Sequence, residues 1–196
     1  MESNVLFDTA IREHTRQEVL GSLECVRLLC KPLGGLAINS TKIDKPIALD
    51  NFVSNEKEMQ LKFLGQYPKD QISLYITEQS IIDSSGWREQ GLSVANFAVV
   101  STIEKNNSEL WMPTIHETGH MLGLVQPEMP NAYGKEHVAN HCSQFSCIMS
   151  TRPTEFPAEL RYYHYKSEPD KVFCKDCQNY LENITELTEL PWYNQV

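Results

Sequence analysis

The chain has 196 residues, of which 41% are hydrophobic and 22% are charged, and its net charge is −9 from 26 acidic and 17 basic residues. This length and composition fit one globular domain, and the acidic balance argues against sequence-independent binding to nucleic acid or to an anionic membrane. Because the sequence contains neither a signal-like N-terminus nor about eighteen consecutive apolar residues, we expect a cytoplasmic protein whose six cysteines stay reduced.

The first hundred residues predict helices that alternate with strands. Apolar residues recur at helical spacing over 9–31, and the helix is expected to end at Lys31-Pro32. A second helix is predicted at 54–67, where polar capping residues precede acidic ones. Residues 84–91 predict a turn or short hairpin. The expected strands are 35–41, 70–77 and 92–102, of which the last is the strongest.

The second half predicts two helices separated by an irregular stretch. The first helix lies within 106–124, with Pro113 in its first turn and Gly123 near its end. Residues 125–165 read as irregular, and 174–190 predict a polar helix that stops before Pro191. We therefore expect one α/β domain of residues 1–196, with an N-terminal subdomain of about 1–123 and a small C-terminal subdomain of about 124–196.

The predicted helix at 106–124 carries the pattern H-E-x-x-H. His116 and His120 are four residues apart, so their imidazoles lie one above the other on one helix face and can bind one zinc ion. Glu117 is turned about 100° from His116 around the helix. It cannot easily reach the same metal, but it can reach a water bound there and act as a general base.

Such a site still lacks a third ligand. Gly123 can end the helix through left-handed geometry and send the chain back across the site, although an ordinary helix cap would look the same. The returning chain offers His137 and His141. Spacing alone leaves both histidines open.

Four cysteines form two close pairs, Cys142 with Cys147 and Cys174 with Cys177. Four thiolates in this arrangement suit a closed, structural zinc site, whereas a redox C-x-x-C motif or plain buried thiols are the alternatives. The remaining two, Cys25 and Cys30, are about 140° apart on their helix. They are therefore expected to be small buried side chains.

The combined motifs resemble the archaemetzincins, zinc metallopeptidases of the metzincin clan. The resemblance covers about residues 116–177. It rests on H-E-x-x-H-x-x-G, then H-C-x₄-C-x-M, then a distal C-x₂-C, and on the apolar strand before the active-site helix. The matching residues are His116, Glu117, His120, Gly123, His141, Cys142, Cys147, Met149, Cys174 and Cys177.

The resemblance implies a metzincin-like α/β fold with a mixed twisted sheet, an active-site helix and a small zinc-stabilised C-terminal subdomain. It makes His141 the third ligand of a catalytic zinc and Met149 the apolar floor beneath it. Cys142, Cys147, Cys174 and Cys177 would hold a second, structural zinc. The implied activity is hydrolysis of peptide or protein substrates, with Glu117 as the base.

Two spacings depart from the family pattern. Seventeen residues, 124–140, separate Gly123 from His141, and 24 residues separate Met149 from Cys174. His137 therefore stays a rival ligand. The alternative functions are a zinc-binding regulatory or interaction protein with little or no proteolytic activity, and a thiol redox protein that uses Cys174 and Cys177.

Overall fold

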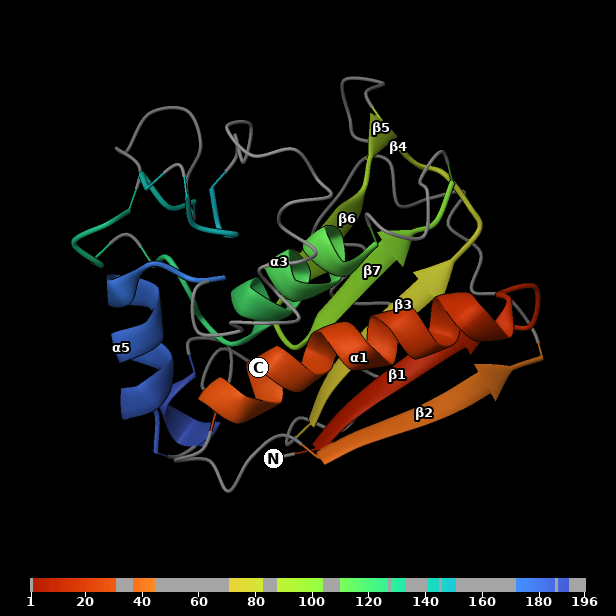
Figure 1. Cartoon of the computed structure of the whole chain (residues 1–196), viewed down its shortest axis with the longest axis horizontal. Coiled ribbons are helices and arrows are strands. Elements are labelled where there is room, and N and C mark those ends of the chain that lie inside the picture. Colours follow the sequence, from red (N-terminus) through yellow and green to blue (C-terminus); the bar gives the residue numbers. More distant parts are fainter. Residues whose placement is uncertain are drawn as a thin grey trace.

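The structure is a computed structural model, and it describes ten segments of the chain (Figure 1). None of the described helices is long and apolar enough to cross a membrane. The predicted helix at 54–67 and the rival ligand His137 lie outside the described residues. The described segments are 2–30, 37–44, 71–82, 88–103, 110–126, 128–132, 141–144, 146–150, 172–185 and 187–190.

A five-stranded mixed sheet forms the base of the molecule, in the order β2-β1-β3-β7-β6. Its strands are β1 (Glu2–Asp8), β2 (Ala37–Ile43), β3 (Gln71–Thr77), β6 (Gly91–Val94) and β7 (Phe97–Ser101). The first four in spatial order pair in parallel, and β6 pairs antiparallel to β7 at one edge. The mixed sheet was predicted, but β1 was not, although its three consecutive apolar residues Val5, Leu6 and Phe7 are all buried.

Helices α1 (Glu13–Leu29) and α3 (Trp111–Met121) cover one face of this sheet side by side (Figure 1). Alternate strand positions such as Phe7, Leu74 and Val100 face them and form the main hydrophobic core. The same core includes C-terminal residues such as Met149 and Leu181. The sheet therefore holds α3 in place, and residues from both of the expected subdomains share one core; the proposed boundary between them stays a prediction.

Two predicted elements are divided in the structure. The strand expected at 92–102 is the hairpin of β6 and β7, and it turns at Ala95 and Asn96, where Ala95 has a φ of 53°. The Asn96 side chain donates to the carbonyl of Gln71 at 2.8 Å. Because apolar residues run through both strands, the hydrophobic pattern did not indicate the turn. Strand β4 (Ile81–Ile82) pairs antiparallel with β5 (Arg88–Glu89), so β5 falls within the turn or short hairpin predicted at 84–91, whereas residues 83–87 lie outside the described part of the chain.

The helix expected at 174–190 is likewise two elements. Helix α5 spans Lys175–Asn183, and a separate 3-10 turn, η4, spans Leu187–Glu189. Ile184 between them has extended backbone and a buried side chain. The Glu189 carboxylate accepts a hydrogen bond of 2.7 Å from the Thr185 N–H. Burial of Ile184 and the hydrogen bond between Thr185 and Glu189 stabilise this break, so the helix does not continue to 190 as the polar pattern suggested.

The end of α3 follows the prediction made from Gly123. That glycine has a φ of 78°. Its N–H donates to the His120 carbonyl at 2.9 Å, and the Leu124 N–H donates to the Gly119 carbonyl at 3.0 Å. This pair of bonds is the Schellman motif, in which the left-handed residue satisfies the last helical carbonyls. The chain thus leaves the helix sharply just after His120.

Gly119 lies between the two helical histidines, where α3 meets Met149. A Cβ built on Gly119 would be 2.4 Å from the Met149 sulfur and 3.2 Å from Leu124 Cδ1. Both neighbours are fully buried, so neither has open space to move into. The missing side chain lets Met149 pack directly beneath the helix turn that carries the histidines.

We expect Gly119→Ala to lower the free energy of unfolding by about 1 kcal/mol. Overpacking costs about 1–3 kcal/mol, and the better helix propensity of Ala returns about 1 kcal/mol. Urea denaturation measures the difference.

The matched control is Gly21→Ala in α1, where a Cβ meets no atom within 4 Å, so the substitution should stabilise by about 0.5–1 kcal/mol. In a Met149→Ala background, Gly119→Ala should behave like the control. If Gly119→Ala and Gly21→Ala change the free energy of unfolding equally in the wild-type background, the close contact between Met149 and Gly119 does not constrain the helix.

Candidate metal centres

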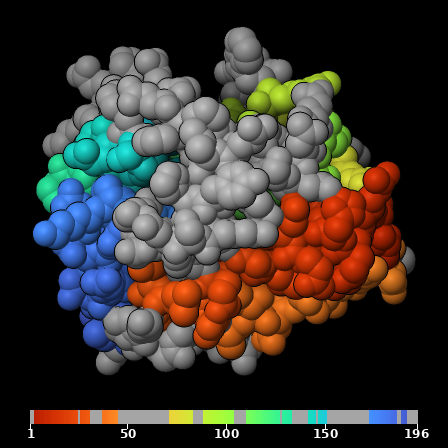
Figure 2. Space-filling view, viewed as in Figure 1, coloured from red at the N-terminus to blue at the C-terminus, as the bar shows by residue number. Residues whose placement is uncertain are grey.

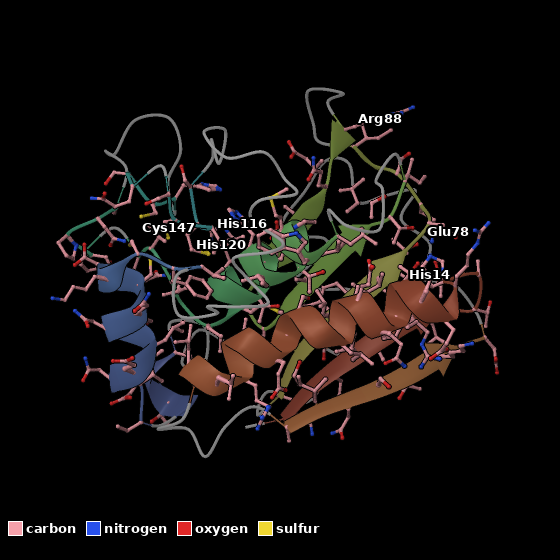
Figure 3. All side chains as sticks on the ribbon, in the orientation of Figure 1. His14, Glu78, Arg88, His116, His120 and Cys147 are labelled. Atoms are coloured by element: carbon pink, nitrogen blue, oxygen red, sulfur yellow. The ribbon has the colours of Figure 1, made fainter. Side chains whose placement is uncertain are left out.

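Three histidine side chains converge at the C-terminal half of α3. His116 and His120 come from this helix (Figure 3), and His141 comes from the described segment 141–144. One ligand nitrogen from each ring can be chosen so that all three lie within 4.8 Å of one another. The ring centroids are 4.7 to 5.2 Å apart. The structure therefore brings together the three histidines that the family resemblance selected.

The orientation of His116 leaves its Nε2 atom free to bind a metal. Its Nδ1 lies 2.8 Å from the Ile148 carbonyl, and because a carbonyl can only accept, Nδ1 carries the hydrogen. The Nε2 lone pair then points toward His120 Nε2, 3.0 Å away. Two nitrogens of one tetrahedral zinc ion are about 3.3 Å apart. A backbone carbonyl that fixes the ring in this way is a common outer partner of metal-binding histidines.

Both helical histidines are neutral over the physiological pH range. Burial lowers the pKa of His116 to about 4, although its hydrogen bond to Ile148 acts in the opposite direction. Burial also lowers the pKa of His120 well below its usual value, and the neighbouring histidines add to the effect. Metal binding requires unprotonated imidazole. His116 and His120 therefore need not be deprotonated before they bind a metal cation near neutral pH.

Glu117 is buried against the edge strand β6. Burial raises the pKa of its carboxyl to about 8, a hydrogen bond from Ser93 lowers it, and the charge of Glu89 raises it further. A Cβ built on Gly91 would lie 2.5 Å from Glu117 Cγ. The edge strand thus provides a gap at Gly91 and a hydroxyl at Ser93 for this one carboxyl group.

The four cysteines form a second cluster. Their sulfurs lie within 4.8 Å of one another, and all four cysteines are free. Cys142 Sγ is 3.6 Å from Cys174 Sγ, and Cys147 Sγ is 3.7 Å from Cys177 Sγ. Four sulfurs around one zinc at ~2.3 Å would be about 3.8 Å apart. The cluster therefore has the size and the donor type of a closed zinc site.

Hydrogen bonds among the four thiols shift their pKa values in opposite directions. The pKa values of Cys142 and Cys174 are lowered, mainly by bonds from Cys147 and Cys142 respectively. The pKa values of Cys147 and Cys177 are raised, in both cases mainly by the bond with Cys142. A divalent cation would replace the shared protons.

The two clusters meet at one peptide bond, between His141 and Cys142. Figure 3 shows Cys147 on the side of α3 that faces α5, close to the labelled histidines. The Cys142 N–H donates to the Met149 carbonyl at 2.9 Å, and the Ile148 N–H donates to the Val172 carbonyl at 3.0 Å. These bonds join both cysteine segments to the loop that supports His116.

Sequence patterns did not identify several residues at these sites. The Ile148 carbonyl, Gly91 and Ser93 belong to no motif, because each is distant in sequence from the helix residue it contacts and is brought there by the fold. Cys30 is buried as predicted, and burial raises the pKa of its thiol to about 12. The Cys25 side chain lies outside the described part of the chain.

Comparison with known proteins found no matching family model and no matching curated protein. Solved structures do match. Archaemetzincin from Methanopyrus kandleri has a TM-score of 0.57 at 17% identity, covering 93% of each chain. Archaemetzincin from Archaeoglobus fulgidus, complexed with malonate, has a TM-score of 0.54 at 18% identity, covering 92% of this chain and 99% of that chain. The chain therefore has the archaemetzincin fold, as its motifs predicted.

Proposed function

We propose that this protein is a zinc-dependent metallopeptidase that hydrolyses peptide bonds. The observation that carries the proposal is the convergence of three imidazoles beside a buried glutamate. The archaemetzincin fold supports it, because the similar solved structures bear the name of a zinc peptidase family. The cytoplasmic location, and the absence of nucleic-acid and membrane partners, stay predictions.

His116, His120 and His141 would hold the catalytic zinc. The donor set fits the metal, since three neutral nitrogen ligands leave a fourth position open for water or substrate. When bound, zinc supplies Lewis-acid chemistry that activates water and polarises a carbonyl group.

Glu117 would move the protons of the reaction. As a carboxylate it accepts a proton when water attacks the peptide carbonyl, and it then gives that proton to the leaving amine. Burial favours the proton-bound form, and the Ser93 hydroxyl steadies the ionised form by hydrogen bonding. A base whose pKa lies near the working pH can perform both transfers. A site that only binds metal needs no such carboxyl group, so the buried Glu117 disfavours the regulatory alternative.

The edge strand β6 is the proposed place for a peptide substrate. It pairs with β7 on one side, and it is the last strand of the sheet in the described structure. Its Gly91 and Ser93 contact Glu117. An extended peptide that pairs with β6 would therefore run beside the general base, as in β-strand addition.

Cys142, Cys147, Cys174 and Cys177 would hold the second, structural zinc. Their sulfur separations suit one tetrahedral ion, and a site closed by four thiolates leaves no position for substrate. All four sulfurs converge, which a redox protein using only Cys174 and Cys177 would not require.

We expect Glu117→Gln to retain zinc and to lose hydrolysis by about 10²–10⁴-fold, because the amide keeps the shape of the side chain but cannot accept the proton. The measurements are turnover on a peptide library and zinc content. Glu128→Gln, at an exposed position, is the control and should match the wild type. Wild-type turnover in Glu117→Gln would contradict the mechanism. Absence of any turnover in the wild type would favour the regulatory alternative.

Elemental analysis should find two zinc ions per wild-type chain and one in the His116→Ala/His120→Ala variant. Loss of two nitrogen ligands removes the catalytic ion, whereas the four thiolates keep theirs. A single zinc present in both proteins would mean that the metal is purely structural, and the peptidase proposal would fail.

A further inference from the structure

One side chain outside both predicted clusters lies against the cysteine sulfurs. Asn131 Nδ2 is 3.1 Å from the sulfur of Cys142, 3.1 Å from that of Cys177 and 3.3 Å from that of Cys174. Asn131 is only 2% exposed. Its amide nitrogen therefore caps the face of the cluster that these three sulfurs form, in a place without bulk water.

The chemistry of the amide explains this orientation. An amide NH₂ group only donates hydrogen bonds, and a sulfur that has lost its proton accepts them. Asn131 Oδ1 is buried and has no hydrogen-bond partner among the described residues. The contacts to sulfur are thus the side-chain bonds that hold Asn131 in place within the described structure.

Backbone N–H groups also donate to the cluster, both to Cys142, which Asn131 contacts too, and to Cys147. The Gln144 N–H donates to Cys142 Sγ at 3.4 Å, and the Cys174 N–H donates to Cys147 Sγ at 3.3 Å. Asn131 is the one group outside the cysteines that donates to Cys177 among the residues described. Four thiolates around a divalent cation leave a net charge of −2, and burial makes each such donor valuable.

We propose that Asn131 is a positioning residue of the four-cysteine metal site, where its side-chain N–H groups hydrogen-bond the thiolates and strengthen zinc binding. This inference rests on the structural zinc of the proposed function. It assigns a role to a residue that belongs to no metal-binding motif.

The proposal also gives a role to the long stretch between Gly123 and His141. Asn131 lies within this stretch, and its carbonyl accepts a hydrogen bond of 2.8 Å from the Ser143 N–H. Ala132 forms an isolated bridge with Cys142. Figure 2 shows the segments around 128–132 and 141–150 directly against α5. The described part of the stretch therefore returns to the cysteine cluster and supplies it with a donor.

The test measures zinc affinity of the cysteine site alone, by chelator competition in full-length His116→Ala/His120→Ala protein. In this background we expect Asn131→Ala to weaken zinc binding about 10–100-fold, the usual effect of losing an outer hydrogen bond. Asn131→Asp should weaken it more, because an oxygen replaces the donor and faces thiolates. A side chain that only fills space predicts the reverse order, since Asp matches the shape of Asn and Ala leaves a cavity.

Asn96→Ala is the matched control. Asn96 is also 2% exposed, and its amide donates to the Gln71 backbone carbonyl, so its loss should change stability and leave zinc affinity unchanged. With cobalt in place of zinc, Asn131→Ala should shift the sulfur-to-metal absorption to lower energy, because unbonded thiolates are richer in electrons.

Three results would overturn the inference. The first is equal zinc affinity in all Asn131 variants, and the second is an Ala variant weaker than the Asp variant. Both leave the proposed zinc site intact. The third is a failure of the parent background to bind any zinc, which would remove the structural zinc and this inference together. Circular dichroism on each variant shows whether the protein is folded when affinity is measured.

Discussion

The arrangement of the histidine cluster and the cysteine cluster depends on the fact that His141 and Cys142 are neighbours in the chain. Consecutive side chains of an extended segment point in opposite directions, so one short segment can serve two clusters. The hydrogen bond from Cys142 to the Met149 carbonyl holds this segment in place. Neither cluster can therefore move without the other.

The loop at 147–150 also contributes to both clusters, through three consecutive residues. Cys147 contributes a sulfur to one cluster, the Ile148 carbonyl orients the His116 ring of the other, and Met149 packs beneath Gly119. A metal ion bound by the cysteines would stiffen this loop and so preserve the alignment of His116. A structural ion, if bound there, would thus have a direct mechanical consequence for the histidines.

Burial acts in opposite ways on the neighbouring residues of α3. It keeps His116 neutral by lowering its pKa, and it favours the protonated form of Glu117 by raising the pKa of that carboxyl. Both effects arise because a low-polarity environment penalises charge. The same environment thus keeps the His116 imidazole uncharged and favours the protonated form of the Glu117 carboxyl.

The sequence by itself determined what depends on near neighbours. The i, i+4 spacing placed His116 and His120 on one helix face, Gly123 ended that helix, and the two cysteine pairs indicated a thiolate site, because helix geometry and short loops act over a few residues. Only the tertiary structure decided what depends on distant segments: the convergence of His141 with α3, the contacts of Gly91 and Ser93 with Glu117, and the approach of Asn131 to the sulfurs. The turn at Ala95 and the break at Ile184 belong to this second group. In each case packing against another segment decided the conformation, and no local pattern encodes such a contact.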